Sequence, residues 1–320
     1  MRTTRREFLQ TTAALTAGVL GGCSTPARTA APRPTKIIDT HTHFYDPSRP
    51  QGAPWPPKDD AVLYRTVLPK NYRALPVPQP VNGTVVVEAS TWVEDNQWIL
   101  DLAAHDPFIV GLVGNLPLGT PEFAAHLKRF AANPLFRGVR IRDGSFEKLL
   151  GERTFVNDLS AVAERGLCFD VQSAPAWVAQ TDRLARLVPN LRLIVNHVAS
   201  AVVTGKEPAD DWRRLMETLA AHPQVFMKVS GLVEGTQRRN GEAPDDVDYY
   251  RPVLDILWKL FGADRLIYGS NWPVSEHFAP LGRVQQIAMS YFATKGQTAL
   301  EKVFWKNAQA AYRWVERKHS

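Results

Sequence analysis

Eight short apolar runs alternate with stretches of helical periodicity, and this alternation constrains the fold of the 320-residue chain more than any other feature. Each run holds about five to eight residues and is rich in β-branched side chains, which is typical of buried strands. Strands that alternate with helices form parallel sheets covered by those helices. The runs are 37–43, 84–90, 108–114, 137–142, 167–172, 191–197, 224–230 and 265–271.

The helical stretches between these runs complete eight strand-and-helix units. We expect helices at 95–105, 120–132, 154–165, 175–188, 209–221, 246–262, 279–293 and 297–316. An α/β fold follows, a single-domain (β/α)8 TIM barrel over residues 36–316, which the C-terminal helix closes. An open doubly wound sheet is the alternative, but no Gly-x-Gly-x-x-Gly follows the first run.

One connection is unusually long. Residues 44–80, after the first run, are rich in proline and include Trp55 within Gly-Ala-Pro-Trp-Pro-Pro. Long loops in compact domains are usually functional or disordered, and barrel active sites lie at the carboxyl ends of the strands. The segment is therefore expected to form a wall or lid over the site, with a rigid loop of no function as the alternative.

The first 35 residues indicate export and not fold. Residues 1–22 combine the twin arginines Arg5 and Arg6 with a short apolar stretch, typical of a twin-arginine signal peptide. Leu-Gly-Gly before Cys23 resembles a lipobox, so we expect a lipid anchor at Cys23 and a flexible tether over residues 23–35. A plain cleaved signal is the alternative. The predicted location is the periplasm, free or membrane-anchored.

Charge and cysteine content limit the partners and the stabilising chemistry. Removal of residues 1–22 takes away three arginines and one glutamate, so the formal net charge falls from +6 to +4. No long basic run accompanies this charge, which argues against nucleic acid and for a small-molecule substrate. With Cys23 acylated, only Cys168 remains, and a disulfide within the chain is excluded.

Polar side chains gather where the predicted strands end. His41 and His43 are two residues apart, so both imidazoles project from one face of a strand. With His197 and Glu88 they make a plausible ligand set for Zn²⁺ or Mn²⁺ with one open position. A hydrogen-bonded histidine pair, and an ion pair of Glu88 with a basic side chain, are the alternatives. The full set is His41, His43, Glu88, Asn115, Arg140, Arg142, Asp170, Gln172, His197, Lys228, Ser230, Asn271 and Trp272.

Several motifs together resemble one family. They are Ile-Asp-Thr-His-Thr-His at 38–43, the Gly-Ala-Pro-Trp-Pro-Pro loop, Phe-Arg-Gly-Val-Arg at 136–140, Asn-His at 196–197, Met-Lys-Val-Ser-Gly-Leu at 227–232, Tyr-Gly-Ser-Asn-Trp-Pro-Val at 268–274 and Asn-Ala at 307–308. Over residues 36–316 the chain resembles the amidohydrolase-related (amidohydrolase 2) branch of the amidohydrolase superfamily. The resemblance implies hydrolysis of sugar-acid or dicarboxylic-acid lactones, with a divalent metal in some relatives and without one in others.

The resemblance also implies roles for single residues. His41, His43 and His197 match the strand-end histidines that hold the metal, and Arg140 and Lys228 match contacts to substrate carboxylate or hydroxyl groups. Substrate contacts are also expected from Trp55, Glu88, Arg142 and Trp272.

Asn271 departs from this pattern. It stands where the family typically has an aspartate that binds metal or moves the proton of the attacking water. An amide does not titrate and brings no negative charge, so it cannot be a general base. His197 or Glu88 then takes the base role, or Asn271 only orients water or substrate, or the protein binds without turnover.

The sequence therefore predicts a hydrolase that opens a lactone of a sugar-derived or dicarboxylic acid, possibly with a metal ion. The alternatives are a decarboxylase on the same scaffold, since fold does not dictate reaction, and a sugar-acid binding lipoprotein.

Overall fold

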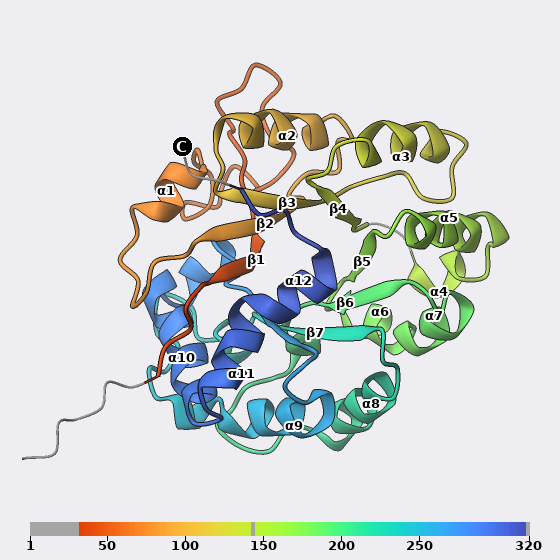
Figure 1. Ribbon diagram of the computed structural model, residues 1–320. Coiled ribbons are helices and arrows are strands. Elements are labelled where there is room, and N and C mark those ends of the chain that lie inside the picture. Colours follow the sequence, from red (N-terminus) through yellow and green to blue (C-terminus); the bar gives the residue numbers. More distant parts are fainter. Residues whose placement is uncertain (1–31, 142–144, 318–320) are drawn as a thin grey trace, which may run out of the picture. The chain divides into compact units, whose positions relative to one another are not determined.

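All eight apolar runs form strands, and these pair in parallel and in chain order around one sheet (Figure 1). The computed structural model describes residues 32–141 and 145–317, which belong to one compact unit. The strands are β1 (Ile38–Thr42), β2 (Gly83–Val87), β3 (Ile109–Gly114), β4 (Phe136–Val139), β5 (Cys168–Val171), β6 (Arg192–Val195), β7 (Val225–Val229) and β8 (Leu266–Tyr268). The prediction of eight parallel strands is confirmed.

The barrel is nearly closed between its first and last strands. Thr42 and Trp272 form an isolated parallel bridge, and the His43 amide donates to the Trp272 carbonyl over 2.9 Å. Between the same two strands, the Thr40 hydroxyl also donates to the Tyr268 carbonyl over 2.6 Å. These bonds bring the end of β1 beside the end of β8, and the (β/α)8 prediction is confirmed.

Helices cover the outside of the sheet, mostly where the periodicity predicts them. They are α1 (Pro69–Arg73), α2 (Asp95–His105), α3 (Phe123–Ala131), α4 (Phe146–Leu149), α5 (Arg153–Glu164), α6 (Pro175–Ala179), α7 (Thr181–Leu187), α8 (Asp210–Ala220), α9 (Arg251–Phe261), α10 (Leu281–Ala293), α11 (Gln297–Glu301) and α12 (Asn307–Tyr312). The short helices α1 and α4 were not expected. The final predicted helix continues from α11 to α12 through a π-helical turn, Lys302–Lys306.

The C-terminal segment closes one end of the barrel. Inward-facing apolar side chains of the strands form a core cluster with Ala308, Ala311 and Tyr312 of α12. The Tyr312 hydroxyl enters this interior and donates to the Asp170 carboxylate over 3.0 Å. In Figure 1 α12 crosses in front of the strands, so the site has to open at the other end of the barrel.

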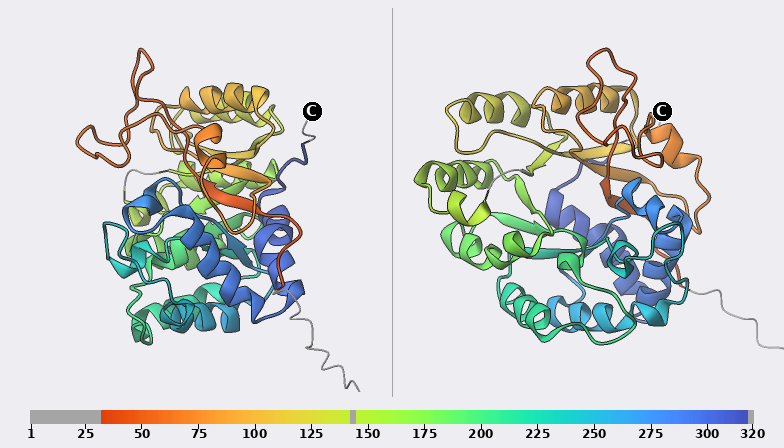
Figure 2. Two further views of the ribbon diagram at one scale, coloured as in Figure 1. Left: turned by 90° about the vertical axis from the view of Figure 1, so that its left-hand side faces the viewer. Right: turned by 180° about the vertical axis from the view of Figure 1, so that it is seen from behind.

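The loop between β1 and β2 lies at that other end, as the left view of Figure 2 shows in orange. Its own contacts fix it: Tyr45 and Val67 form an antiparallel bridge, and Arg49 pairs with Asp95 of α2 over 2.9 Å. The Tyr72 hydroxyl of α1 donates to the buried Asp39 carboxylate over 2.8 Å. The predicted wall is therefore an ordered, anchored segment.

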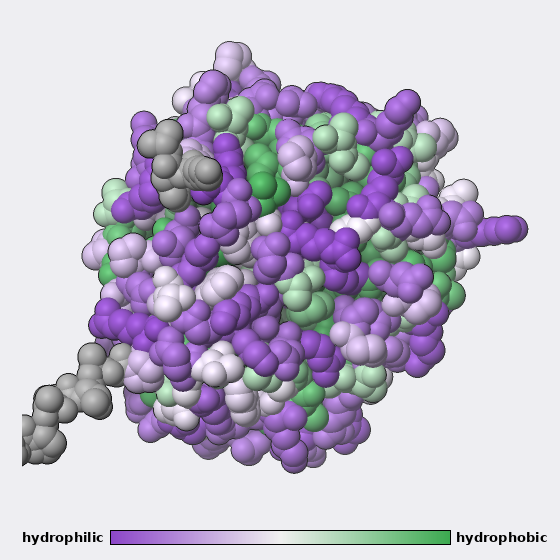
Figure 3. All heavy atoms as spheres, in the orientation of Figure 1, coloured by the Kyte–Doolittle hydropathy of each residue, from purple (hydrophilic) through white to green (hydrophobic). Residues whose placement is uncertain are grey.

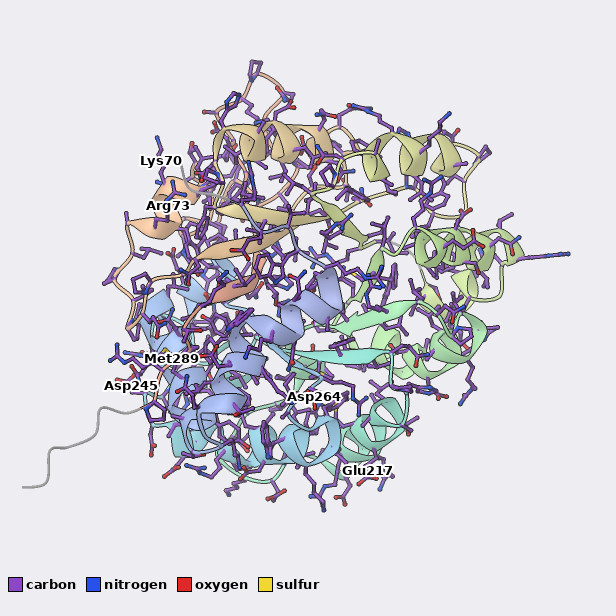
Figure 4. The ribbon with its side chains drawn as sticks, in the orientation of Figure 1. Lys70, Arg73, Glu217, Asp245, Asp264 and Met289 are labelled. Atoms are coloured by element: carbon purple, nitrogen blue, oxygen red, sulfur yellow. The ribbon has the colours of Figure 1, made fainter. Side chains whose placement is uncertain are left out.

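Charged side chains lie on the outer faces of the helices. On the face drawn in Figure 3 hydrophilic residues predominate, with hydrophobic ones scattered between them. Figure 4 labels examples: Lys70 and Arg73 on α1 and Glu217 on α8 are exposed, while Met289 of α10 is buried. Each covering helix thus keeps one apolar side toward the sheet.

The predicted signal peptide, Cys23 and most of the tether lie outside the described residues. Within the described part of the chain, no helix has both the length and the apolar character needed to span a membrane. The last tether residues are held on the barrel, since the Thr35 amide and hydroxyl each donate to the Glu301 carboxylate over 2.7 Å. The predicted route of export and lipid anchor remain predictions.

Candidate active site

A pocket of about 240 Å³ opens at the carboxyl ends of the strands. Polar side chains from four different loops line it together with small residues. The lining residues are Ser173, His197, Ser200, Ala201, Val202, Gly231, Glu234, Gly235, Gln237 and Asn271. The pocket equals roughly eight water volumes of about 30 Å³, which suits a ligand of monosaccharide size.

An unusual backbone turn positions His197 in this pocket. The chain leaves β6 through four consecutive residues with positive φ, from His197 (52°) to Ser200 (52°). Such a conformation is uncommon outside glycine and clusters at functional sites. Gly231 makes room for the turn, because a Cβ atom there would lie 2.5 Å from the His197 Cβ. The His197 Nδ1 and the Ser230 hydroxyl lie 2.9 Å apart and share a hydrogen bond.

The three predicted histidines meet beside the pocket. The ring centroid of His41 lies 5.0 Å from that of His43 and 4.4 Å from that of His197. The Nδ1 of His43 donates to the Val87 carbonyl over 2.9 Å, which makes its Nε2 an acceptor. The structure therefore brings the three strand-end histidines together, while their catalytic and metal-binding roles stay predictions.

His41 has the opposite tautomer because of Lys228. The Lys228 ammonium donates to the Asp170 carboxylate over 2.8 Å and to the His41 Nδ1 over 3.1 Å. An imidazole nitrogen that accepts leaves the hydrogen on the other nitrogen, so Nε2 of His41 is an N–H donor. That Nε2 is buried and has no hydrogen-bond partner among the described residues. His41 therefore presents a donor to whatever binds next to it.

Burial and positive charge keep the imidazoles of His41 and His197 from gaining protons. Burial, followed by repulsion from Lys228, lowers the pKa of both His41 and His197 well below the usual range. Burial also lowers the pKa of Lys228, against the attraction of Asp170. Both imidazoles are accordingly neutral at physiological pH.

Arg140 and Glu88 form a buried ion pair. The Arg140 Nε donates to Glu88 Oε1 over 2.9 Å, and Nη2 donates to the Glu88 backbone carbonyl over 2.6 Å. The structure therefore shows Glu88 paired with a basic neighbour, and its predicted substrate contact stays a prediction. Arg142, the expected second substrate arginine, lies outside the described residues.

The two tryptophans predicted to touch substrate differ in position. Trp55 lies in the wall loop, with its ring centroid 5.5 Å from that of His43. Trp272 is buried between the barrel and the loop, where it packs against Phe44 and Tyr72 and donates from Nε1 to Glu276. A substrate contact is thus compatible with Trp55. Trp272 packs between the barrel and the loop and is not among the lining residues of this pocket, and the predicted substrate contacts of both tryptophans stay predictions.

Asn271 is bound to an acidic residue that the sequence analysis did not single out. The chain reaches Asn271 at the end of β8 with φ of 58°, and its Nδ2 donates to Glu234 Oε1 over 2.8 Å. Glu234 begins the 3₁₀ turn η2 (Glu234–Thr236) beyond the end of β7. The sequence analysis considered only residues at the ends of the predicted strands. Glu234 lies beyond the end of β7 and was therefore not selected. Its position in the loop after β7 was the only signal of a role.

Burial raises the pKa of Glu234 to about 7, against the stabilising hydrogen bond from Asn271. The folded state therefore holds the proton more tightly than the unfolded state, where the pKa is near the ordinary 4.5. The stability that comes from this proton is present below about pH 4.5 and is lost as the pH rises through about 7.

Glu234→Gln is expected to raise the melting temperature at pH 8 by several degrees and to leave it nearly unchanged at pH 4.5. The glutamine removes a desolvated charge that costs up to about 3 kcal/mol above pH 7. Thermal unfolding of both proteins at the two pH values measures the difference. An equal shift at both pH values would contradict the raised pKa.

The described side chains at the pocket are not arranged as a divalent-cation site in this structure. A metal ligand must offer a lone pair and preferably a negative charge, but Nε2 of His41 carries hydrogen. The carboxylates of Glu88 and Asp170 are held by Arg140 and Lys228, and position 271 is an amide. In residues 32–141 and 145–317, no three or more His, Cys, Asp or Glu side chains are placed to hold a metal ion.

Comparison with known proteins agrees with this architecture. The family model described as "Amidohydrolase" matches residues 38–314. L-fucono-1,5-lactonase of Burkholderia ambifaria is 32% identical over 289 residues, 86% of this chain and 95% of that protein. L-fucono-1,5-lactonase of Burkholderia multivorans is 26% identical over 296 residues, 85% of this chain and 94% of that one.

A solved structure shows the same fold. The crystal structure of an amidohydrolase from Burkholderia multivorans with bound Zn superimposes with a TM-score of 0.78 at 22% identity. The superposition covers 87% of this chain and 99% of that one.

Proposed function

The chain belongs to the amidohydrolase family, and on that premise we propose that it hydrolyses a lactone of a small polyhydroxylated acid. The observation that carries the proposal is the 32% identity to an L-fucono-1,5-lactonase along 95% of that enzyme's length. The pocket supports it, because serine, glutamine, asparagine and glutamate side chains supply donors and acceptors for several hydroxyl groups.

His41 is proposed to stabilise the oxyanion. Attack of water on the lactone carbonyl places negative charge on the carbonyl oxygen, and preorganised donors aimed at that oxygen lower the barrier. The Nε2–H of His41 is buried beside the pocket residue His197 and has no partner in residues 32–141 and 145–317. Lys228 holds the tautomer and adds positive charge, while Arg140 contributes to the same field from its pair with Glu88.

Hydrolysis without a divalent metal is part of the proposal. The predicted Zn²⁺ or Mn²⁺ site at His41, His43 and His197 would require removal of the hydrogen from Nε2 of His41 next to a buried ammonium group. The positive charge of Lys228 and Arg140 instead favours an anionic oxygen in the same space. A metal ion bound by these histidines would stabilise the oxyanion in place of the Nε2–H of His41. The assay below distinguishes hydrolysis with a metal from hydrolysis without one.

The test is a pH-indicator assay of the purified protein with a panel of five- and six-membered aldonolactones and uronolactones that includes L-fucono-1,5-lactone. We expect acid release above the spontaneous rate for at least one lactone, and an equal rate after EDTA treatment and after addition of Zn²⁺ or Mn²⁺. Loss of the rate with EDTA and its recovery with metal would refute the metal-free mechanism only. Release of CO₂ from a carboxylated substrate, or thermal stabilisation by an unchanged ligand without turnover, would replace the function itself.

A further inference from the structure

The proposed hydrolysis needs a residue that moves a proton, and Asn271 cannot do so. Amides do not titrate, His41 presents a hydrogen and not a lone pair, and Glu88 is neutralised by Arg140. Burial lowers the pKa of His197, the other base considered, well below the usual range, which makes it a weak base. We propose that Glu234 is the catalytic acid and base of this site and that Asn271 positions it. This inference rests on the proposed lactone hydrolysis.

The two carboxylate oxygens of Glu234 have different surroundings. Oε1 accepts from the Asn271 amide over 2.8 Å. Oε2 is buried and has no hydrogen-bond partner among the described residues. Because Asn271 donates to Oε1 whether the carboxyl group is charged or neutral, the exchangeable proton belongs on Oε2. One oxygen is thus held by Asn271, and the other is a buried acceptor whose hydrogen bond the described residues do not supply.

Glu234 also lines the proposed substrate pocket. It lines the same pocket as His197 and Asn271, and His197 connects that pocket to the His41 donor through ring centroids 4.4 Å apart. A carbonyl group bound with its oxygen toward His41 therefore has the Glu234 carboxylate on the pocket side. Proximity of an attacking water to both its base and its electrophile is what general base catalysis requires.

The surroundings of Glu234 favour reversible proton exchange near neutral pH. The titratable groups that face it are His197 across the pocket and Tyr250 at the start of α9, and Asn271 is its neutral partner. No ion pair between Glu234 and a basic side chain occurs among the described residues. Burial raises the pKa of Glu234 to about 7, which suits a group that both takes and returns a proton.

The asparagine is consistent with this assignment. An aspartate at position 271 would place a second carboxylate within hydrogen-bond distance of Glu234, and two such groups share one proton. The asparagine keeps a single titrating carboxyl group at the pocket and gives it a fixed donor. Asn271 replaces the base that was expected after β8. Through its hydrogen bond it instead supports Glu234 as the base, in the loop after β7.

The reaction balances with water as the only co-reactant. The Glu234 carboxylate takes a proton from water as the water oxygen forms a bond to the lactone carbonyl carbon, and the carbonyl π electrons move to the oxygen. Collapse of this tetrahedral intermediate breaks the bond between the carbonyl carbon and the ring oxygen. Glu234 returns its proton to that leaving oxygen, and the product is the open hydroxy acid.

The experiment compares wild type, Glu234→Gln and the matched control Glu242→Gln on the lactone that the wild-type protein hydrolyses fastest. Glu242 is an exposed glutamate in the loop after β7. We expect the wild type and the control to gain activity as the pH rises through about 7. Glu234→Gln is expected to lose about 10²- to 10⁴-fold in kcat, to keep its KM within a few fold, and to lose the rise in activity near pH 7.

Two further variants distinguish a catalytic role of Glu234 from a role in packing. Glu234→Asp keeps a carboxyl group and should retain a pH-dependent rate between those of wild type and Glu234→Gln. Adding Asn271→Asp to Glu234→Gln restores one carboxyl group to the pocket and should recover at least about tenfold in kcat, with the pH rise displaced.

Three results would overturn the inference or its premise. An active wild type together with an equally active Glu234→Gln overturns the role of Glu234 and leaves lactone hydrolysis standing. A slow Glu234→Gln that keeps the wild-type pH rise also overturns it, because another group then titrates. A folded wild type that opens no lactone of the panel overturns the proposed function and this inference with it.

Discussion

Replacement of His41 and His43 together by asparagine is expected to reduce lactone hydrolysis by about 10³-fold or more while the barrel stays folded. The Nε2 of His41 is buried and has no hydrogen-bond partner among the described residues, and it is the proposed donor to the oxyanion. His43 packs against both His41 and Trp55, so its loss also displaces the wall loop. The measurement is kcat/KM on the best lactone, with circular dichroism and thermal unfolding as checks on the fold.

A matched control uses two histidines on helices. His105 ends α2 and is exposed, and His126 of α3 stacks on Phe130. His105→Asn with His126→Asn removes the same number of imidazoles without touching the pocket, and its kcat/KM should match that of wild type. Retained activity in the His41 and His43 double variant, at wild-type stability, would reject the site described here.

The strands were predictable because their periodicity and burial coincide. The run at 84–90, for example, is apolar on successive residues, and β2 is buried at every position. Such a pattern occurs where both faces of a parallel strand are covered. The helices α1 and α4 were missed because five and four residues carry too little periodicity to be distinguished from loop.

The histidine cluster was predictable for a topological reason and Glu234 was not. The carboxyl ends of parallel strands converge whatever the sequence of the loops, so His41, His43 and His197 had to meet once the barrel was assumed. Glu234 reaches the pocket only because the chain turns back after β7 into a 3₁₀ turn. Its position depends on loop geometry, which no period in the sequence encodes.

The metal prediction depended on residue types, and tautomers decide it. Three imidazoles at strand ends are equally compatible with a cation and with an anionic oxygen. Lys228 settles which nitrogen of His41 carries hydrogen, and this residue lies 187 positions away in sequence from the histidine it controls. A ligand count from the sequence cannot include such a contact, and the proposed oxyanion role of His41 depends on it.

Lys228→Met is expected to lower both stability and activity, each for its own reason. Lys228 and Asp170 are fully buried and paired over 2.8 Å, so removal of the ammonium leaves an uncompensated carboxylate in the barrel interior. Breaking a buried pair in this way costs about 3–5 kcal/mol. The same variant leaves Nδ1 of His41 without its donor, and loss of the fixed tautomer should reduce kcat by about 10²-fold. Chemical unfolding and steady-state kinetics measure the two effects.

Adding Asp170→Asn to Lys228→Met separates the effect on stability from the effect on activity. The asparagine removes the unpaired charge and can still accept from the Tyr312 hydroxyl that now bonds Asp170, so most of the lost stability should return. Activity should stay low, because no group in the double variant donates to Nδ1 of His41. Recovery of kcat together with stability in the double variant would mean that Lys228 matters only for the integrity of the barrel. If Lys228→Met alone unfolded at the same denaturant concentration as wild type, the buried pair would not stabilise the fold at all.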